Sequence, residues 1–318
     1  MAILLACGRA LAQDELPAEA GEANLRGARL RLNGDYQEAK KEFERVIRLA
    51  PGSRFGLYNR GMVWRDLGDC RSAIEDFTRA LAIAPDFFGA LYHRGNCRQA
   101  TGEFAAAIDD YSRAIALPGR VDGRFLAYFG RADARRRSGD LEAALADYTR
   151  VAEMRTDTMA LRSRAWVNLY LGRWQKSYED AARFLQGSEG KETGSGYVAL
   201  VGYIALRRLG ERAKADAALA AWGTQIRSPG WPAPVLKFFG GGIGAPELAA
   251  AAATEGERLE ADCYIGIAQL LAGERAKGVR TLKGVLERGD SQYWEFDLAY
   301  HELKRLGEAG DAPKRPRR

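Results

Sequence analysis

Residues 54–85, RFGLYNRGMVWRDLGDCRSAIEDFTRALAIAP, decide the fold of this chain. The stretch predicts two antiparallel helices joined at Gly68, a residue suited to the left-handed backbone conformation that ends a helix. Asp69 follows it and can cap the second helix, which Pro85 ends. Helical spacing gives each helix one apolar or small face. The first helix contributes Leu57, Gly61 and Trp64 to this face, and the second contributes Ala73, Ile74, Phe77, Ala80 and Leu81.

The same pattern recurs along the chain with a period of 34 residues. A lone helical hairpin cannot cover its own apolar face, whereas stacked copies bury one another. Several independent positions repeat together, which makes chance a poor explanation. They are a small residue at Gly27, Gly61 and Gly95, a turn glycine at Gly34, Gly68 and Gly102, an alanine at Ala39, Ala73 and Ala107, and an aromatic residue at Phe43, Phe77 and Tyr111. Pro51 and Pro85 close the first two units, and Pro118 lies one residue early in the third.

A 34-residue helix–turn–helix with these positions resembles the tetratricopeptide repeat. The resemblance implies an all-α, right-handed solenoid of helical hairpins. The small residues let neighbouring helices approach closely, and the aromatic residue fills the gap between them. We expect six repeats over residues 20–222, at 20–51, 54–85, 88–118, 125–154, 158–185 and 197–222.

The regular pattern stops after residue 222. Residues 223–257 are rich in Pro and Gly and predict a connector with short helices, one at 234–239 and one from Pro246 through 249–253. Residues 258–308 predict a degenerate hairpin followed by a terminal helix at 294–306. Because one side of a terminal solenoid unit faces water, we expect this helix to cap the stack. Residues 309–318 predict a disordered basic tail.

The N-terminus predicts a targeting segment. Residues 1–12 begin with an apolar run and end in Ala10-Leu11-Ala12, a pattern that suits signal-peptide cleavage before Gln13. Leu4-Leu5-Ala6-Cys7 also resembles a lipobox, in which Cys7 would be lipidated. An uncleaved cytosolic end is the third interpretation. No later apolar run approaches the roughly 18 residues that span a bilayer.

The charge of the chain does not predict a nucleic-acid partner. The formal net charge is +6 over 318 residues. The tail contributes a net +3, because Asp311 offsets one of its four basic residues, and Arg9 contributes +1, so the remaining body is near +2. The basic tail residues are Lys314, Arg315, Arg317 and Arg318.

The sequence offers little support for catalysis. His93 and His301 are the two histidines, each isolated in the sequence, and neither belongs to an HExxH pattern. No cysteine spacing suggests a metal site. We therefore expect a protein that is not an enzyme, with no cofactor and no metal. A substrate-binding subunit of an enzyme and a sensor of a small molecule or glycan stay open as alternatives.

Two cysteines predict a disulfide. Cys70 begins the second helix of the second repeat, and Cys97 lies late in the first helix of the third repeat. Packing of these helices would bring the two together. In an oxidising compartment, a bond across this separation would add about 3–4 kcal/mol to the free energy of unfolding. Two reduced thiols in the core are the alternative.

The tetratricopeptide resemblance also implies a binding surface. Four positions on the first helix of each repeat line the concave groove of such proteins. Mixed aromatic and Arg side chains there suit a protein or peptide partner, because these residues dominate binding hot spots. The alternative is that some of them pack against neighbouring helices. The groove candidates are Phe55, Tyr58, Met62, Arg65, Tyr92, Asn96, Gln99, Leu126, Phe129, Asp133, Arg136, Arg162, Trp166 and Leu169.

The C-terminal part resembles the end of NlpI-type envelope lipoproteins. The resemblance rests on the order of Trp231-Pro232, an apolar helix ending in Phe238-Phe239-Gly240, then ADCYIGIAQLLAGERAKG and EFDLAYHELKRL. It implies an adaptor that docks a periplasmic protease or peptidoglycan hydrolases, and that often dimerises. The sequence thus predicts a non-catalytic interaction adaptor of the bacterial cell envelope, periplasmic or anchored to the outer membrane through Cys7. The alternative is a cytosolic assembly scaffold.

Overall fold

The computed structural model describes residues 16–118, 121–154, 158–192, 194–226, 230–288 and 293–310. Every regular element in these ranges is a helix, as the sequence predicts. The chain forms two compact units. Within these ranges, unit 1 comprises residues 16–118 and 121–138, and unit 2 comprises the described residues from 139 to 310. The expected signal segment, Cys7 and most of the basic tail lie outside the described residues.

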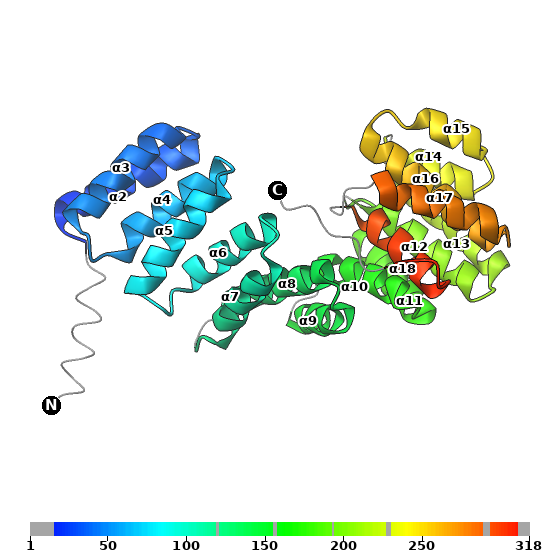
Figure 1. The fold of residues 1–318 in the computed structure, drawn as a ribbon, viewed down its shortest axis with the longest axis horizontal. Coiled ribbons are helices and arrows are strands. Elements are labelled where there is room, and N and C mark those ends of the chain that lie inside the picture. Colours follow the sequence, from blue (N-terminus) through cyan, green and yellow to red (C-terminus); the bar gives the residue numbers. More distant parts are fainter. Residues whose placement is uncertain are drawn as a thin grey trace. The chain divides into compact units, whose positions relative to one another are not determined.

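Unit 1 consists of helical hairpins that follow one another along the chain. Each helix packs against the next, and each hairpin stacks on the one before it (Figure 1). The hairpins pair the helices α2 with α3, α4 with α5 and α6 with α7, and α8 then packs on α7. The bounds are α2 (Ala18–Asn33), α3 (Tyr36–Leu49), α4 (Arg54–Asp66), α5 (Cys70–Ile83), α6 (Phe88–Ala100), α7 (Phe104–Ala116) and α8 (Val121–Ser138).

The turns of these hairpins form where the sequence predicts them. Gly34, Gly68 and Gly102 have φ values of 88°, 82° and 82°, the left-handed conformation that a side chain would strain. Asp69 caps α5, because its Oδ1 accepts a hydrogen bond from the backbone N of Ser72 at 3.1 Å. The 34-residue recurrence of glycine is therefore a recurrence of one turn geometry.

The repeated small and aromatic positions meet inside each hairpin. A Cβ atom added to Gly27, Gly61 or Gly95 would lie 2.8 Å from a ring carbon of Phe43, Phe77 or Tyr111 respectively. All three rings are fully buried. A side chain of any size at these glycines would therefore push the two helices of the hairpin apart. The close approach predicted from the repeat is confirmed.

Unit 2 continues with hairpins and then departs from them. The structure has helices at the expected places in the connector, the degenerate hairpin and the C-terminal segment. The hairpins pair α10 with α11, α12 with α13, and α16 with α17. The bounds are α9 (Leu141–Met154), α10 (Thr158–Tyr170), α11 (Trp174–Ser188), α12 (Ser195–Arg208), α13 (Arg212–Gln225), α14 (Ala233–Phe239), α15 (Ala245–Ala251), α16 (Glu255–Leu271), α17 (Arg275–Arg288) and α18 (Trp294–Arg305).

Helix α18 folds back onto earlier helices of unit 2. It packs against α16 and α17, and also against α10 (Figure 1, red). Four of its apolar side chains, Phe296, Leu298, Ala299 and Leu303, are buried. None of the described helices is long and apolar enough to cross a membrane.

Candidate functional site

An aromatic patch lies at the N-terminal ends of α4 and α6 in unit 1. We define it as Phe55, Tyr58, Phe87, Phe88 and Tyr92, all half-buried. The ring centroids of Tyr58 and Phe87 are 4.7 Å apart, and those of Phe55 and Phe87 are 6.3 Å apart. Phe88 stacks on Tyr92 at 6.1 Å. The rings therefore form two groups from neighbouring hairpins, and His93 bridges them through ring contacts with Tyr58 and Tyr92. Each ring of the patch keeps part of its area exposed to solvent.

A cation borders this patch. The guanidinium of Arg54 lies 4.8 Å from the ring centroid of Phe55 and 4.9 Å from that of Phe87. At these distances the positive charge is attracted to the electron-rich ring faces. The pairing orients both rings at the edge of the patch.

A polar ladder links α2, α4 and α6. Asp66 accepts hydrogen bonds from Arg31 Nε at 2.6 Å and from Arg65 Nη2 at 2.8 Å. Arg65 Nη1 lies 2.8 Å from His93 Nδ1. Burial, together with the charges of Arg65 and Arg31, lowers the pKa of His93 to about 4. The imidazole is therefore neutral near pH 7 and accepts the Arg65 hydrogen bond through Nδ1. We call Arg31, Arg65, Asp66 and His93 the polar ladder.

Further polar contacts join the first helices of successive hairpins. Asn59 donates from Nδ2 to Asn24 Oδ1 at 2.7 Å, and Gln99 donates from Nε2 to Asp133. The core residue Tyr111 donates its hydroxyl to Asn96 Oδ1 at 2.6 Å. These contacts hold the stacking of hairpins in unit 1. They also satisfy several polar groups of this face within the chain.

The predicted groove residues divide by exposure. Phe55, Tyr58, Arg65, Tyr92, Asn96, Gln99 and Phe129 in unit 1 and Arg162 in unit 2 are half-buried. Met62, Arg136 and Trp166 are only 7%, 4% and 3% exposed, so their assignment to a partner-contacting surface needs correction. Met62 belongs to the core of unit 1, together with Leu57 and Leu91. These three side chains are too buried in the folded chain to contact a partner.

Helix α18 explains the burial of Trp166. The ring of Trp294 lies 5.7 Å from that of Trp166, and the backbone carbonyl of Trp294 accepts a hydrogen bond from the Tyr170 hydroxyl at 2.7 Å. Arg208 of α12 forms an ion pair with Glu302 of α18, whose side chain is 1% exposed. The chain's own helix thus covers this side of α10. Local periodicity shows that α18 has an apolar face but does not show which helix that face meets.

The structure contains a recurring ion pair that the sequence analysis missed. An Arg on the first helix of a hairpin bonds to the acid 16 residues later on the second helix. The pairs are Arg26–Glu42 at 3.3 Å, Arg60–Asp76 at 2.7 Å, Arg94–Asp110 at 2.6 Å and Arg164–Asp180 at 2.9 Å. The 34-residue recurrence of Arg26, Arg60 and Arg94 was the signal that could have found it.

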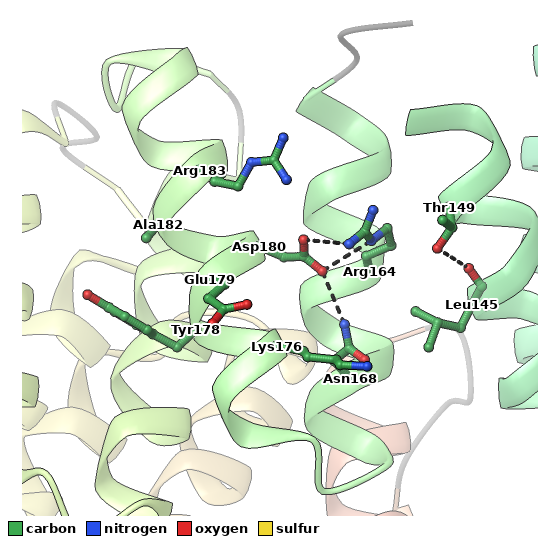
Figure 2. A pocket seen from close by; sticks show the side chains of 10 residues that line it. All are labelled: Leu145, Thr149, Arg164, Asn168, Lys176, Tyr178, Glu179, Asp180, Ala182 and Arg183. Atoms are coloured by element: carbon green, nitrogen blue, oxygen red, sulfur yellow. Dashed lines mark hydrogen bonds and ion pairs between the residues drawn. The ribbon is translucent and has the colours of Figure 1, made fainter. Parts of the chain in front are cut away.

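Unit 2 has a hollow of about 620 Å³ between α9, α10 and α11 (Figure 2). At its floor Asp180 accepts hydrogen bonds from Arg164 and, at 3.1 Å, from Asn168 Nδ2. Burial raises the pKa of Asp180, and Arg164 opposes the rise. Because the same Arg–acid pair recurs in the other hairpins, its role here is to join α10 to α11. The lining residues are Leu145, Thr149, Arg164, Asn168, Lys176, Tyr178, Glu179, Asp180, Ala182 and Arg183.

The other candidate chemical groups take part in packing. His93 lies among aromatic rings, and His301 stacks on Tyr170 at 5.2 Å. Cys70, Cys97 and Cys263 are free thiols, with Cys70 half-buried and the other two buried. The described residues include no group of three His, Cys, Asp or Glu side chains that could hold a metal ion.

Comparison with known proteins defines the class of fold. Residues 22–53, which comprise most of α2 and α3, match a tetratricopeptide-repeat family model. The fold of the described chain is that of the tetratricopeptide-repeat solenoids, as three solved structures show. The comparison with curated proteins gave no match.

The three structures share the fold at low sequence identity. A tetratricopeptide repeat protein from Parabacteroides merdae is 15% identical with a TM-score of 0.56, over 90% of this chain and 100% of its own. PilW, described as a widely conserved type IV pilus biogenesis factor, is 17% identical with a TM-score of 0.55, over 67% and 96%. PilF of Pseudomonas aeruginosa is 14% identical with a TM-score of 0.55, over 66% and 90%.

Proposed function

We propose that the protein is a non-catalytic interaction adaptor that binds a segment of a partner protein at the aromatic patch of unit 1. The observation that carries the proposal is the set of half-buried rings in which Tyr58 packs on Phe87 and Tyr92 stacks on Phe88. Aromatic side chains of this kind supply large contact areas and dominate binding hot spots. Rigid helices already hold the rings, so binding orders few side chains and its entropic cost is small.

The surrounding charges suggest the chemistry of the partner segment. In the polar ladder, Arg31 and Arg65 both pair with the single carboxylate of Asp66. Two positive charges and one negative charge leave a local excess of positive charge. Burial is the main cause of the lowered pKa of His93, and the positive charges of Arg65 and Arg31 add to it. We therefore propose a segment with apolar anchors for the aromatic patch and an acidic residue facing the ladder. Complementary charge of this kind favours encounter and register more than affinity.

We further propose that the protein works in the bacterial cell envelope, with its mature N-terminus at Gln13 or a lipid at Cys7. The apolar segment 1–12 and the order of C-terminal elements that resembles NlpI-type lipoproteins support this proposal. The shared fold with PilW, a pilus biogenesis factor, agrees with it. A periplasmic protease or a peptidoglycan hydrolase is the partner that the resemblance favours, and a homodimer is compatible with it.

Site-directed crosslinking in the host tests the binding surface. A photoreactive amino acid at position 92 should form crosslinks to one partner protein. The matched control position is 75, an exposed site on α5. Crosslinks of equal yield to the same partner at both positions would contradict the proposal.

Binding measurements with the identified partner give the second test. Replacing Tyr58 and Tyr92 together by Ala should weaken the affinity at least about tenfold, since truncating a hot-spot aromatic costs more than 1 kcal/mol. The control is Lys41→Ala, which changes an exposed side chain of α3. Unchanged affinity of a double variant that keeps its helical circular dichroism would refute the proposed surface.

Mapping the mature N-terminus after cell fractionation tests the compartment. A chain that starts at Gln13 in the periplasm, or one lipidated at Cys7, supports the envelope. An intact segment 1–12 in the cytosol would instead identify a cytosolic assembly scaffold. Either result leaves the binding test at the aromatic patch unaffected.

A further inference from the structure

Two thiols from neighbouring hairpins meet in unit 1. Cys70 is the first residue of α5, and Cys97 lies in the last turn of α6. Cys97 is 1% exposed and belongs to a core that includes Leu57 and Leu81, and Cys70 packs against that core. The helices α5 and α6 that carry them pack together, and Cys70 is the neighbouring side chain that, after burial, raises the pKa of Cys97. The structure therefore brings together two residues that are separated by two helices in the sequence.

The position of each thiol is set by a capped helix end. The turn at Gly68 and the Asp69 cap fix the start of α5, where the backbone N of Cys70 donates to the carbonyl of Gly68 at 3.0 Å. The left-handed Gly102 ends the turn after α6, and the backbone N of Thr101 donates to the carbonyl of Cys97 at 3.0 Å. The contact between the thiols is thus a consequence of stacking two rigid hairpins.

We propose that Cys70 and Cys97 form a disulfide bond when the protein meets a thiol oxidant that itself carries a disulfide. Cys70 is the half-exposed member of the pair and reacts first. Its thiolate attacks one sulfur of the oxidant, forms a mixed disulfide and releases one thiolate of the oxidant. Cys97 then loses its proton to solvent and attacks the Cys70 sulfur, which releases the mixed-disulfide partner as a second thiolate.

The products of this reaction balance. Two cysteine thiols lose two electrons and two protons, and the oxidant gains the two electrons to become two thiols. Burial, together with the adjacent Cys70, raises the pKa of Cys97. The closing step is therefore the slow one, because only the Cys97 thiolate can attack. The finished bond joins the second hairpin to the third.

The effect of the bond is to restrict the stacking of α5 on α6. These two helices pack together in unit 1, and α6 carries Phe88 and Tyr92 of the aromatic patch. A cross-link that closes a loop of this length raises the midpoint of thermal unfolding by about 5 °C. Neither cysteine belongs to the patch, so the bond stabilises the surface without contributing to its chemistry.

The test uses the purified full chain with Cys7→Ser, which removes the cysteine outside the described residues. The protein is incubated with oxidised glutathione in native buffer, free thiols are alkylated, and the unreduced peptides are mapped by mass spectrometry. Cys263 is the internal control, because it is fully buried and donates from Sγ to the carbonyl of Glu295 at 3.3 Å. The expected result is one link, between the Cys70 and Cys97 peptides, with Cys263 alkylated only after denaturation.

Thermal unfolding provides an independent readout. The oxidised protein should unfold at a higher temperature than the reduced protein, and dithiothreitol should reverse the shift. Cys70→Ser and Cys97→Ala should each abolish the difference between oxidised and reduced samples. Recovery of both cysteines as free thiols, or of a stable glutathione adduct at Cys70 with no closure, would overturn the proposal. Partner binding is measured separately, so failure here leaves the adaptor function intact.

Discussion

Arg94 and Asp110 form a bidentate ion pair inside a single hairpin of unit 1. Arg94 donates from Nε to Oδ2 at 2.9 Å and from Nη2 to Oδ1 at 2.6 Å. Arg98 donates to the same carboxylate from Nη1 at 2.7 Å. The Asp110 side chain is fully buried, so two guanidinium groups depend on it for their counter-charge.

Asp110→Ala is therefore expected to destabilise the protein by about 3–5 kcal/mol, because it leaves partly buried cations without their carboxylate. The matched control is Glu42→Ala, which removes the equivalent acid where the partner Arg26 is 43% exposed. That variant should lose less than about 1 kcal/mol. Urea unfolding of both variants measures the difference, and equal losses would show that burial of the pair is unimportant.

Gly95→Ala is expected to lower the free energy of unfolding by about 1–3 kcal/mol, since the new Cβ would press on the ring of Tyr111. Gly21→Ala provides the control, because a Cβ at this position in α2 meets nothing within 4 Å. Alanine there should stabilise the helix by up to about 1 kcal/mol. Thermal unfolding of the two variants should move in opposite directions. A stabilised Gly95→Ala protein would argue against the close approach of α6 and α7.

Trp166→Ala should reduce stability and leave partner binding unchanged. The side chain is buried beneath α18, and truncation of a large buried aromatic residue costs about 3–5 kcal/mol. Tyr92→Ala should show the reverse pattern, with weaker binding and a smaller loss of stability. Unfolding and binding measurements on both variants separate the two roles. Loss of partner binding in a well-folded Trp166→Ala protein would restore this residue to the binding surface.

The stability of unit 2 should fall as the pH rises from 6.5 to 8.5. Burial, reinforced by the charge of Glu260, raises the pKa of Glu295 to about 8. In this pH range the folded protein keeps a proton on Glu295 that the unfolded chain has already released, so rising pH favours unfolding. The expected loss is about 1–2 kcal/mol. The range starts at pH 6.5 because the lowered pKa of His93 acts in the opposite sense below it.

The variant Glu295→Gln tests whether Glu295 causes this loss of stability with rising pH. The groups around Glu295 are Tyr264, which donates to Oε1 at 2.8 Å, and the acids Glu260 and Asp297. Glu260 itself accepts from Trp231 Nε1 at 2.6 Å and from the Tyr197 hydroxyl at 2.9 Å. Glutamine keeps the shape without the titration, so the slope of stability against pH should flatten. The same slope in the variant as in the parent protein would place the titration elsewhere.

The fold follows from the sequence wherever one position repeats for one physical reason. Gly68 adopts a positive φ, and Gly61 leaves room for the ring of Phe77. Because each hairpin has both requirements, a glycine recurs at both positions every 34 residues. The Arg residues of the Arg–acid pairs recur in the same way, at Arg26, Arg60 and Arg94. Apolar and small residues define a repeat more visibly than charges do, since charges also occupy exposed positions at random.

The candidate site is predictable only in part, because exposure depends on contacts between distant segments. Tyr58 and Met62 lie one turn apart on α4, yet Tyr58 joins the aromatic patch and Met62 joins the core. Trp166 is covered by a helix more than a hundred residues later in the chain. Repeat position shows which face of a helix a residue occupies, and tertiary packing decides whether that face stays open.

The bond between Tyr170 and Trp294 has a consequence for the order in which the protein is made. The two residues are 124 positions apart, so α10 emerges from the ribosome long before the helix that covers it. Hairpins of unit 1 find their partners among their immediate neighbours in sequence and can assemble during synthesis. In unit 2, Trp166 and Tyr170 lack the cover of α18 until that helix has been synthesised. The burial of these two rings therefore depends on a helix that is synthesised more than a hundred residues later.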